Sequence, residues 1–300
     1  CRGDRPFAGP RKVGRWALES DNVVSPGWFY YILTMGLPKP ISFFFLACVC
    51  FYFLAMVLRI NPWLAIGGAL AYAYATYNPI IIAAGHDTKM QSIALMPALV
   101  GAVILVYERK YWLGAALTAL FTALLVGMNH PQIAYYTFLI LLFMSIGYAV
   151  NWIRKGDMKH LLTAFAIVVV TGLIGVLCNA VSLLTTYEYS KESIRGGSAL
   201  ATGTSNSTTT GLSADYALSY SMYKSEPFVM MVPKMYGGSN SLEVAQEESK
   251  AIEALQQMPQ ELAQQLQYNL GAYWGGIGGT SGPPYVGAVI CFLTLIGFFI

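Results

Sequence analysis

Long apolar runs separated by short polar turns dominate the sequence. A helix that crosses the hydrocarbon layer of a membrane needs about 20 mostly apolar residues, and soluble core helices rarely run so far without a charge. The pattern predicts about seven membrane-spanning helices, the last continuing beyond residue 300: Ile41–Leu58, Pro62–Ala84, Ser92–Tyr107, Tyr111–Gly127, Pro131–Asn151, Leu161–Leu184 and Pro284–Ile300. The predicted fold class is an all-α polytopic membrane protein in contact with the lipid bilayer.

Composition supports a membrane protein and excludes other classes. Hydrophobic residues make up 56% of the chain and charged residues 11%, whereas a soluble domain carries roughly 25% charged residues. The net charge of +3 is too small to predict a nucleic-acid partner. Cys48 and Cys50 lie about 200° apart around a helix, so they are interpreted as small apolar side chains and not as a disulfide or a ligand pair.

The pattern divides the chain into four parts. Residues 1–24 are polar and basic, atypical of the rest, and open to interpretation as a non-native segment. Residues 25–184 are predicted to form a helical bundle of six spans, and residues 185–283 a large external loop. Within that loop, 242–270 has the spacing of an amphipathic helix pair broken at Pro259. Residues 284–300 begin a further span, and the aromatic run Trp28–Tyr31 predicts a helix in the membrane interface.

The distribution of basic residues predicts the orientation. Alternate short loops contain Arg59, then Arg109 with Lys110, then Arg154, Lys155 and Lys159. The intervening loops contain only Lys89. Cytoplasmic loops carry the excess of Lys and Arg, so the first set is placed in the cytoplasm. The large loop and the turns 86–91 and 128–131 then lie on the outer, periplasmic side of a bacterial cytoplasmic membrane.

The outer side collects the residues with candidate chemistry. His86 and Asp87 offer an imidazole and a carboxylate for proton transfer or metal ligation. Glu188 is a third candidate catalytic residue, and it lies one helical turn from Glu192. Candidate substrate-binding residues on the same side are Lys89, Asn129, His130, Gln132, Lys191 and Arg195. The cations among them suit a phosphate; whether a divalent cation serves as cofactor is left open by these residues.

Each motif also has a structural interpretation. A His-Asp pair in a tight turn is often a helix cap with an interfacial hydrogen bond. Asn129-His130-Pro131 is typical of an N-cap followed by proline at the first helical position. The charged residues from Glu188 to Arg195 have the spacing of ion pairs on one solvated helix. Their shared side of the membrane favours a functional interpretation.

Taken together and in order, five motifs resemble the YfhO family of bacterial membrane proteins, in the form associated with Bacteroidetes. They are Leu33–Pro40, Gly85-His86 with Lys89, Leu113–Leu120 followed by Asn129–Gln132, Thr186–Lys191 with Arg195-Gly196, and Tyr273–Gly275 with Thr280–Pro283 and Tyr285–Ala288. The resemblance covers roughly residues 25–300.

The resemblance implies a longer parent protein and a fold similar to the GT-C class of membrane glycosyltransferases. Such enzymes transfer a sugar from a polyprenyl-phosphate carrier to an envelope glycan, lipid or polymer. It also implies that the principal catalytic carboxylate follows a span upstream of these residues. Lys89, Lys191 and Arg195 are then expected to neutralise the lipid-linked phosphate, with His86, Asp87 and Glu188 in acid–base or acceptor contacts.

Two other functions fit parts of the pattern. A transporter or flippase of a lipid-linked or small solute is favoured by Asn78 and Pro79, which interrupt the second span. It is disfavoured because transporters place ionisable residues near the middle of the membrane, and these spans carry almost none. A non-catalytic envelope-assembly protein, with 242–270 as a docking surface, remains an alternative.

Overall fold

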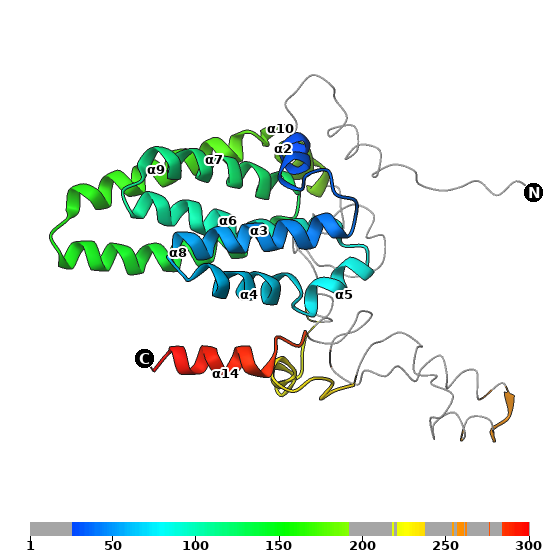
Figure 1. The fold of residues 1–300 in the computed structure, drawn as a ribbon. Helices are drawn as coiled ribbons and strands as arrows, with labels where there is room; N and C mark the ends of the chain where they lie inside the picture. The colour runs from blue at the N-terminus through cyan, green and yellow to red at the C-terminus, as the bar shows by residue number, and fades with distance from the viewer. Residues whose placement is uncertain are drawn as a thin grey trace, which may run out of the picture. The chain divides into compact units, whose positions relative to one another are not determined.

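The computed structural model describes residues 26–191, 218, 221–237, 254, 257–260, 262, 276 and 284–299 (Figure 1). These residues are mostly helical and contain no β-strand. The chain forms two compact units. The first unit is Cys1–Ala73 with His86–Tyr189, and the second is Tyr74–Gly85 with Ser190–Ile300.

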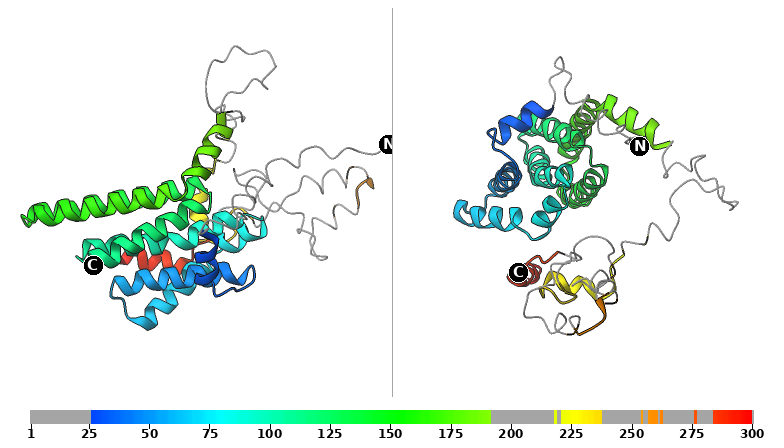
Figure 2. Two further views of the ribbon diagram at one scale, coloured as in Figure 1. Left: turned by 90° about the horizontal axis from the view of Figure 1, so that it is seen from above. Right: turned by 90° about the vertical axis from the view of Figure 1, so that its right-hand side faces the viewer.

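The first unit is a helical bundle. Its helices are α2 (Pro26–Leu33), α3 (Ile41–Val57), α4 (Pro62–Ala73), α6 (Asp87–Tyr107), α7 (Tyr111–Gly127), α8 (Pro131–Arg154), α9 (Met158–Leu177) and α10, which continues from Ala180 to Lys191. Helix α6 packs against α3, α7 and α8, and α7 packs in turn against α9 (Figures 1 and 2).

Burial differs sharply among the three longest apolar helices. In helix α6, 78% of the most apolar stretch is buried, whereas the corresponding stretches of α8 and α9 are 28% and 17% buried. Large apolar side chains on the outer faces of α8 and α9 are therefore exposed, among them Phe143, Leu162 and Leu173. Exposed apolar surface of this extent marks a surface that contacts lipid or another protein. These three helices are long and apolar enough to cross a membrane.

Small residues let the helices approach closely. A Cβ added at Gly101 of α6 would lie 2.9 Å from the Phe53 ring of α3. One at Gly114 of α7 would lie 2.6 Å from the backbone nitrogen of Val106. In a membrane, packing of this kind contributes much of the attraction between helices, because lipid tails are as apolar as the side chains.

Three connections at one end of the bundle share one turn geometry. After α3, α6 and α8, a residue with positive φ ends the helix: Arg59 (φ 60°), Arg109 (φ 66°) and Gly156 (φ 70°). In each case the next N–H bonds back to a carbonyl five residues earlier, as Ile60 N does to Ala55 O at 3.0 Å. This is the Schellman arrangement. It explains how such short loops reverse the chain.

Most predicted span boundaries agree closely with the helices, but two predicted spans are each divided. The second divides into α4 and α5 (Tyr77–Ala83). The division falls at residues 74–76 and not at Asn78-Pro79, because proline in the first turn of a helix removes no hydrogen bond. The sixth divides into α9 and α10, where Asn179 Nδ2 donates to Ala123 O at 2.9 Å.

The second unit contains α5, the 3-10 helix η2 (Glu226–Met230) and α14 (Ala288–Gly297). Two segments meet the chain just before α14. Thr76 Oγ1 donates to Tyr285 O at 2.6 Å, and the amides of Val286 and Gly287 both donate to Met230 O. The predicted amphipathic pair at 242–270 lies almost wholly outside the described residues.

Two glycines of α9 provide a matched test of helix packing. A Cβ at Gly175 would lie 2.6 Å from Thr122 Cβ and 2.7 Å from Ala119 O, both on α7. We expect Gly175→Ala to push α9 off α7 and to lower the unfolding free energy by about 1–3 kcal/mol. The measurement is thermal unfolding in detergent. Gly172 has no atom within 4 Å of its added Cβ, so Gly172→Ala should be neutral or stabilising; equal loss in both variants would contradict the packing.

Candidate functional site

Ion pairs and charges show how the two ends of the first unit are composed. Lys39 precedes α3 and pairs with Asp87 at the start of α6, while Arg59 after α3 lies 3.5 Å from Glu108 after α6. Helices α3 and α6 therefore run parallel. We call the end with Lys39, His86–Lys89 and Asn129–Gln132 the histidine end, and the end with Arg59, Glu108–Lys110 and Arg154–Lys159 the basic end.

His86 and Asp87 begin helix α6. His86 is the N-cap residue by position, but its side chain makes no capping hydrogen bond and is exposed. Asp87 lies in the first helical turn, where the helix dipole favours a negative charge, and its carboxylate pairs with the Lys39 ammonium. A helix cap was one interpretation of this pair from the sequence. His86 does occupy the N-cap position of α6, but its side chain does not form the capping hydrogen bond.

Lys39 is a member of the histidine end that the sequence did not single out as a site residue. Its ammonium reaches Asp87 across 48 positions of sequence and lies 5.6 Å from the centre of the Phe43 ring. The only feature of the sequence that could have indicated a role for Lys39 is its position just before the apolar run that starts at Ile41. Both side chains of the pair are substantially exposed, 62% for Lys39 and 38% for Asp87, and such pairs contribute about 0–1 kcal/mol. The pair orients the cation more than it stabilises the fold.

His130 and Lys89 come together from different helices. Partial burial, the Lys89 ammonium and the His86 ring each lower the pKa of His130 below its ordinary value. Tyr107 near the end of α6 contacts Ser145 and Tyr148 of α8, so the two helices run parallel and begin at the same end of the bundle. His130 Nδ1 is buried and accepts or donates no hydrogen bond within the described residues. With this lowered pKa, the imidazole is neutral near neutral pH.

Asn129 and Gln132 flank His130. Asn129 takes a positive φ of 54° as the residue that ends α7, a conformation that asparagine adopts more readily than most residues. The N-cap of α8 is His130 and not Asn129, with Pro131 at the first helical position as predicted. Gln132 Nε2 donates to the Tyr136 hydroxyl at 2.9 Å along α8, so its amide is held on the outer surface of that helix.

The third predicted motif is only partly described. Glu188 lies on α10 and is exposed, and its side chain has no hydrogen bond or ion pair to another residue of the described ranges. Lys191 ends that helix, and its side chain is not among those described; Arg195 and Glu192 lie outside the described residues. The structure thus brings His86, Asp87, Lys89 and His130 together, with Asn129 and Gln132 beside them, and leaves the other three predicted residues unassigned to this group.

The histidine end has the electrostatic character of an anion site. Lys39 and Lys89 supply two cations against the one carboxylate of Asp87, and α6 and α8 both begin here with unsatisfied backbone N–H groups. Helix N-termini carry partial positive charge and bind phosphate groups well. Metal ligation is less well supported, since the described part of the chain contains no group of three or more His, Cys, Asp and Glu that would hold an ion.

The basic end contains a buried network that the sequence did not predict. His160 is 3% exposed; its Nε2 lies 2.9 Å from Tyr107 O, and its Nδ1 lies 2.6 Å from the Tyr111 hydroxyl. A carbonyl only accepts, so Nε2 carries the proton and Tyr111 donates to Nδ1. The Arg109–Asp157 ion pair joins the same two loops. With both ring nitrogens engaged, His160 is a structural residue that joins α6, α7 and α9.

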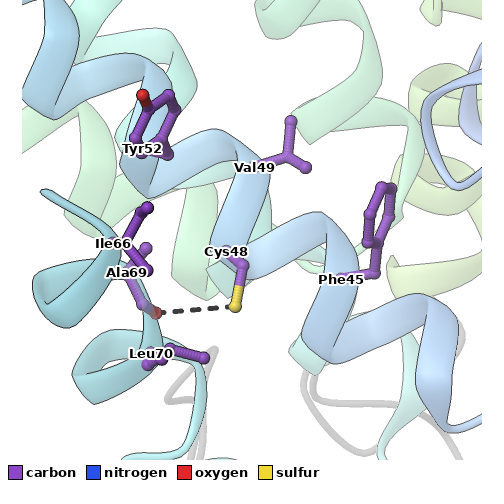
Figure 3. A pocket seen from close by; sticks show the side chains of 7 residues that line it. All are labelled: Phe45, Cys48, Val49, Tyr52, Ile66, Ala69 and Leu70. Carbon is purple, nitrogen blue, oxygen red and sulfur yellow. Dashed lines mark hydrogen bonds between the residues drawn. The ribbon is translucent and has the colours of Figure 1, made fainter. Parts of the chain in front are cut away.

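An apolar groove lies between α3 and α4. It has a volume of about 320 Å³ and is lined by Phe45, Cys48, Val49, Tyr52, Ile66, Ala69 and Leu70 (Figure 3). Its clearest polar contact is internal, from Cys48 Sγ to Ala69 O at 3.7 Å. With no group of polar side chains converging on it, the groove suits a hydrocarbon chain and offers no chemistry.

No protein-family model, curated protein sequence or solved structure matches this chain. The functional argument therefore depends on the residues and their geometry.

The coupling of His130 to Lys89 is directly testable. Lys89→Gln removes one of the charges that lower the pKa of His130, so we expect that pKa to rise toward the ordinary value of about 6.5. The chain has three histidines, so NMR titration of the imidazole resonances in detergent resolves each. Lys110→Gln, which removes the same charge at the basic end, should leave the pKa of His130 unchanged. An unchanged pKa of His130 in Lys89→Gln would show that Lys89 and His130 are not electrostatically coupled.

The same lowered pKa has a consequence for stability. The unfolded chain takes up a proton at His130 at higher pH than the folded chain does, so this residue destabilises the fold as pH falls below about 6.5 and has no effect above it.

Proposed function

We propose that this chain belongs to an outward-facing membrane glycosyltransferase with a GT-C-like fold and about seven spans. The donor is a sugar linked through phosphate to a polyprenyl lipid, and the acceptor is a glycan, lipid or polymer of the bacterial cell envelope. The enzyme lies in the cytoplasmic membrane with its large loop on the outer side. The observation that carries the proposal is that His86, Lys89 and His130 lie at the starts of the parallel helices α6 and α8, at one end of the bundle.

The proposed chemistry is electrostatic. Sugar transfer from a lipid phosphate leaves negative charge on the departing phosphate, and cations aimed at that charge stabilise the transition state. Lys89 is the best-supported phosphate ligand, with Lys191 and Arg195 proposed alongside it. Lys39 holds Asp87, which gives this carboxylate a positioning role. His86 and Glu188 remain candidates for contacts to the acceptor or for proton transfer.

His130 has a specific proposed role at this site. Because its pKa is lowered, the imidazole is neutral near neutral pH, and its buried Nδ1 has no hydrogen-bond partner among the described residues. A neutral imidazole can accept a proton from an acceptor hydroxyl or donate a hydrogen bond, depending on its tautomer. Asn129 and Gln132 lie beside it and are proposed to contact the sugar.

The polar residues inside the bundle support an enzyme over a transporter. Within the described helices of the first unit, the buried hydroxyls of Ser92, Thr137 and Ser145 bond to carbonyls of their own helix, as Thr137 does to Ile133 O at 2.8 Å. No Asp, Glu, Lys or Arg is buried in these helices. A transporter places such groups along its path through the membrane, so the ends of this bundle are the better candidates for function.

Activity of variants in the full-length protein tests the site. Lys89→Gln removes a proposed phosphate ligand, and we expect transfer to an envelope acceptor to fall by at least tenfold, with the amount of protein in the membrane unchanged. The readout is mass spectrometry of surface polymers and lipids from cells that carry each variant. Lys110→Gln is the matched control at the basic end and should behave like wild type. Unaltered products in both variants would refute the site.

The orientation is tested separately. The basic end holds six cations and two carboxylates, from Arg59, Glu108–Lys110 and Arg154–Lys159, so we expect it in the cytoplasm. Topology reporters fused near Lys110 and Gly156 should report the cytoplasm, and a reporter near Ser205 should report the outside. The reverse pattern would place the histidine end on the cytoplasmic side and would contradict its role in an outward-facing transferase.

A further inference from the structure

A run of apolar residues in the second unit is displayed on the surface. Pro227–Pro233 contains seven residues, none of them charged. Val229 alone is buried, at 4% exposure, while Phe228 is 58% and Val232 51% exposed. Runs of exposed apolar residues are rare on surfaces that face water, and they mark sites that contact lipid or protein.

The local structure prevents these side chains from turning inward. Glu226, directly before the run, is fully buried, and its carboxylate accepts from the amides of Tyr223 and Gly276, the latter at 3.0 Å. Gly276 fits so closely that an added Cβ would lie 2.5 Å from Ser221 O. The chain before the run is therefore fixed to a second segment by a buried, hydrogen-bonded carboxylate, which is costly to release.

The chain after the run is also fixed. The Ser225 and Tyr236 hydroxyls form a hydrogen bond that brings the two flanks of Pro227–Pro233 together. The run is thus a closed loop within 3-10 helix η2 and the turns that follow it. Its two neighbouring cations, Lys224 and Lys234, lie one on each flank and are both exposed.

The loop is attached to the start of α14. Met230 O accepts hydrogen bonds from Val286 N at 3.1 Å and from Gly287 N at 3.2 Å. Helix α14 follows at Ala288; it contains no charged residue, and none of its residues is buried. A helix of this composition is expected to enter the hydrocarbon layer. The backbone bonds then hold the apolar loop at the depth where α14 enters.

We propose that Pro227–Pro233 inserts into the boundary between lipid headgroups and acyl chains beside α14, with Lys224 and Lys234 at the level of the lipid phosphates. The partner is the bilayer itself. Apolar and aromatic side chains flanked by Lys are typical of segments that lie in the membrane interface, and Lys side chains reach from there to the phosphates. The inference rests on the proposed membrane position of α14.

Depth measurements on the full chain in phosphatidylcholine vesicles test this insertion. In a chain whose five native cysteines are replaced by alanine, an environment-sensitive fluorophore is attached to Phe228→Cys. We expect blue-shifted emission and strong quenching by lipids with a nitroxide at the headgroup or at carbon 5, and weaker quenching by a nitroxide at carbon 12. Met231→Cys, 39% exposed in the same run, provides a second, independent label.

Two control positions separate the possible outcomes. Gln257 is exposed elsewhere in the second unit, and a label there should report water. Leu295 lies roughly 10 Å along α14 from its start and should be quenched most by the carbon-12 nitroxide. Labels at Phe228 and Met231 that behave like Gln257 would overturn the insertion, and blue-shifted emission without lipid quenching would show that protein covers the loop. Lack of quenching at Leu295 would instead refute the membrane position of α14.

Discussion

The burial of α6 among α3, α7 and α8 determines the remainder of the first unit. The most apolar stretch of α6 is 78% buried, far more than that of α8 or α9. Small residues such as Gly101 allow neighbouring helices to approach closely. In a membrane, the hydrophobic effect does not drive one helix against another, so this close packing holds the bundle together. Because the neighbours of α6 are packed along its length, their ends are fixed at its two ends. Each polar group at a helix end therefore has a defined set of neighbours.

The arrangement around α6 separates two electrostatic environments. Helices α3 and α6 run parallel, and α8 runs parallel to α6 and begins at the same end. The histidine end thus presents helix N-termini, which attract anions. At the other end, the same helices finish in Schellman turns, and cations such as Arg59 and Arg109 follow the last helical turn, a position at which positive charge is favourable. The difference in chemistry between the two ends follows from helix direction as much as from the residues themselves.

The sequence predicted what local periodicity determines and missed what depends on contacts between helices. The bounds of α3 and α7 were predicted almost to the residue, because polar turn residues limit both runs. An interruption of the second span was expected at Asn78-Pro79, and the break falls a few residues earlier, before α5. The break before α10 was not predicted, since it occurs inside an apolar stretch and is fixed by Asn179, which bonds to α7. The Lys39–Asp87 pair joins residues 48 positions apart, and no local signal indicates it. The meeting of His86, Lys89 and His130 was expected only as a shared side of the membrane.

Proton binding and anion binding are linked at the histidine end. Burial and the positive charge of Lys89 lower the pKa of His130, so the empty site holds a neutral imidazole near neutral pH. A phosphate bound beside Lys89, as proposed, would oppose that effect, because a nearby negative charge favours the imidazolium. Binding of the donor would then raise the pKa of His130 and make its neutral imidazole a stronger base toward the acceptor hydroxyl. Burial and Lys89 keep the imidazole neutral without an anion, and the bound phosphate would offset part of that effect at the step where a base is needed.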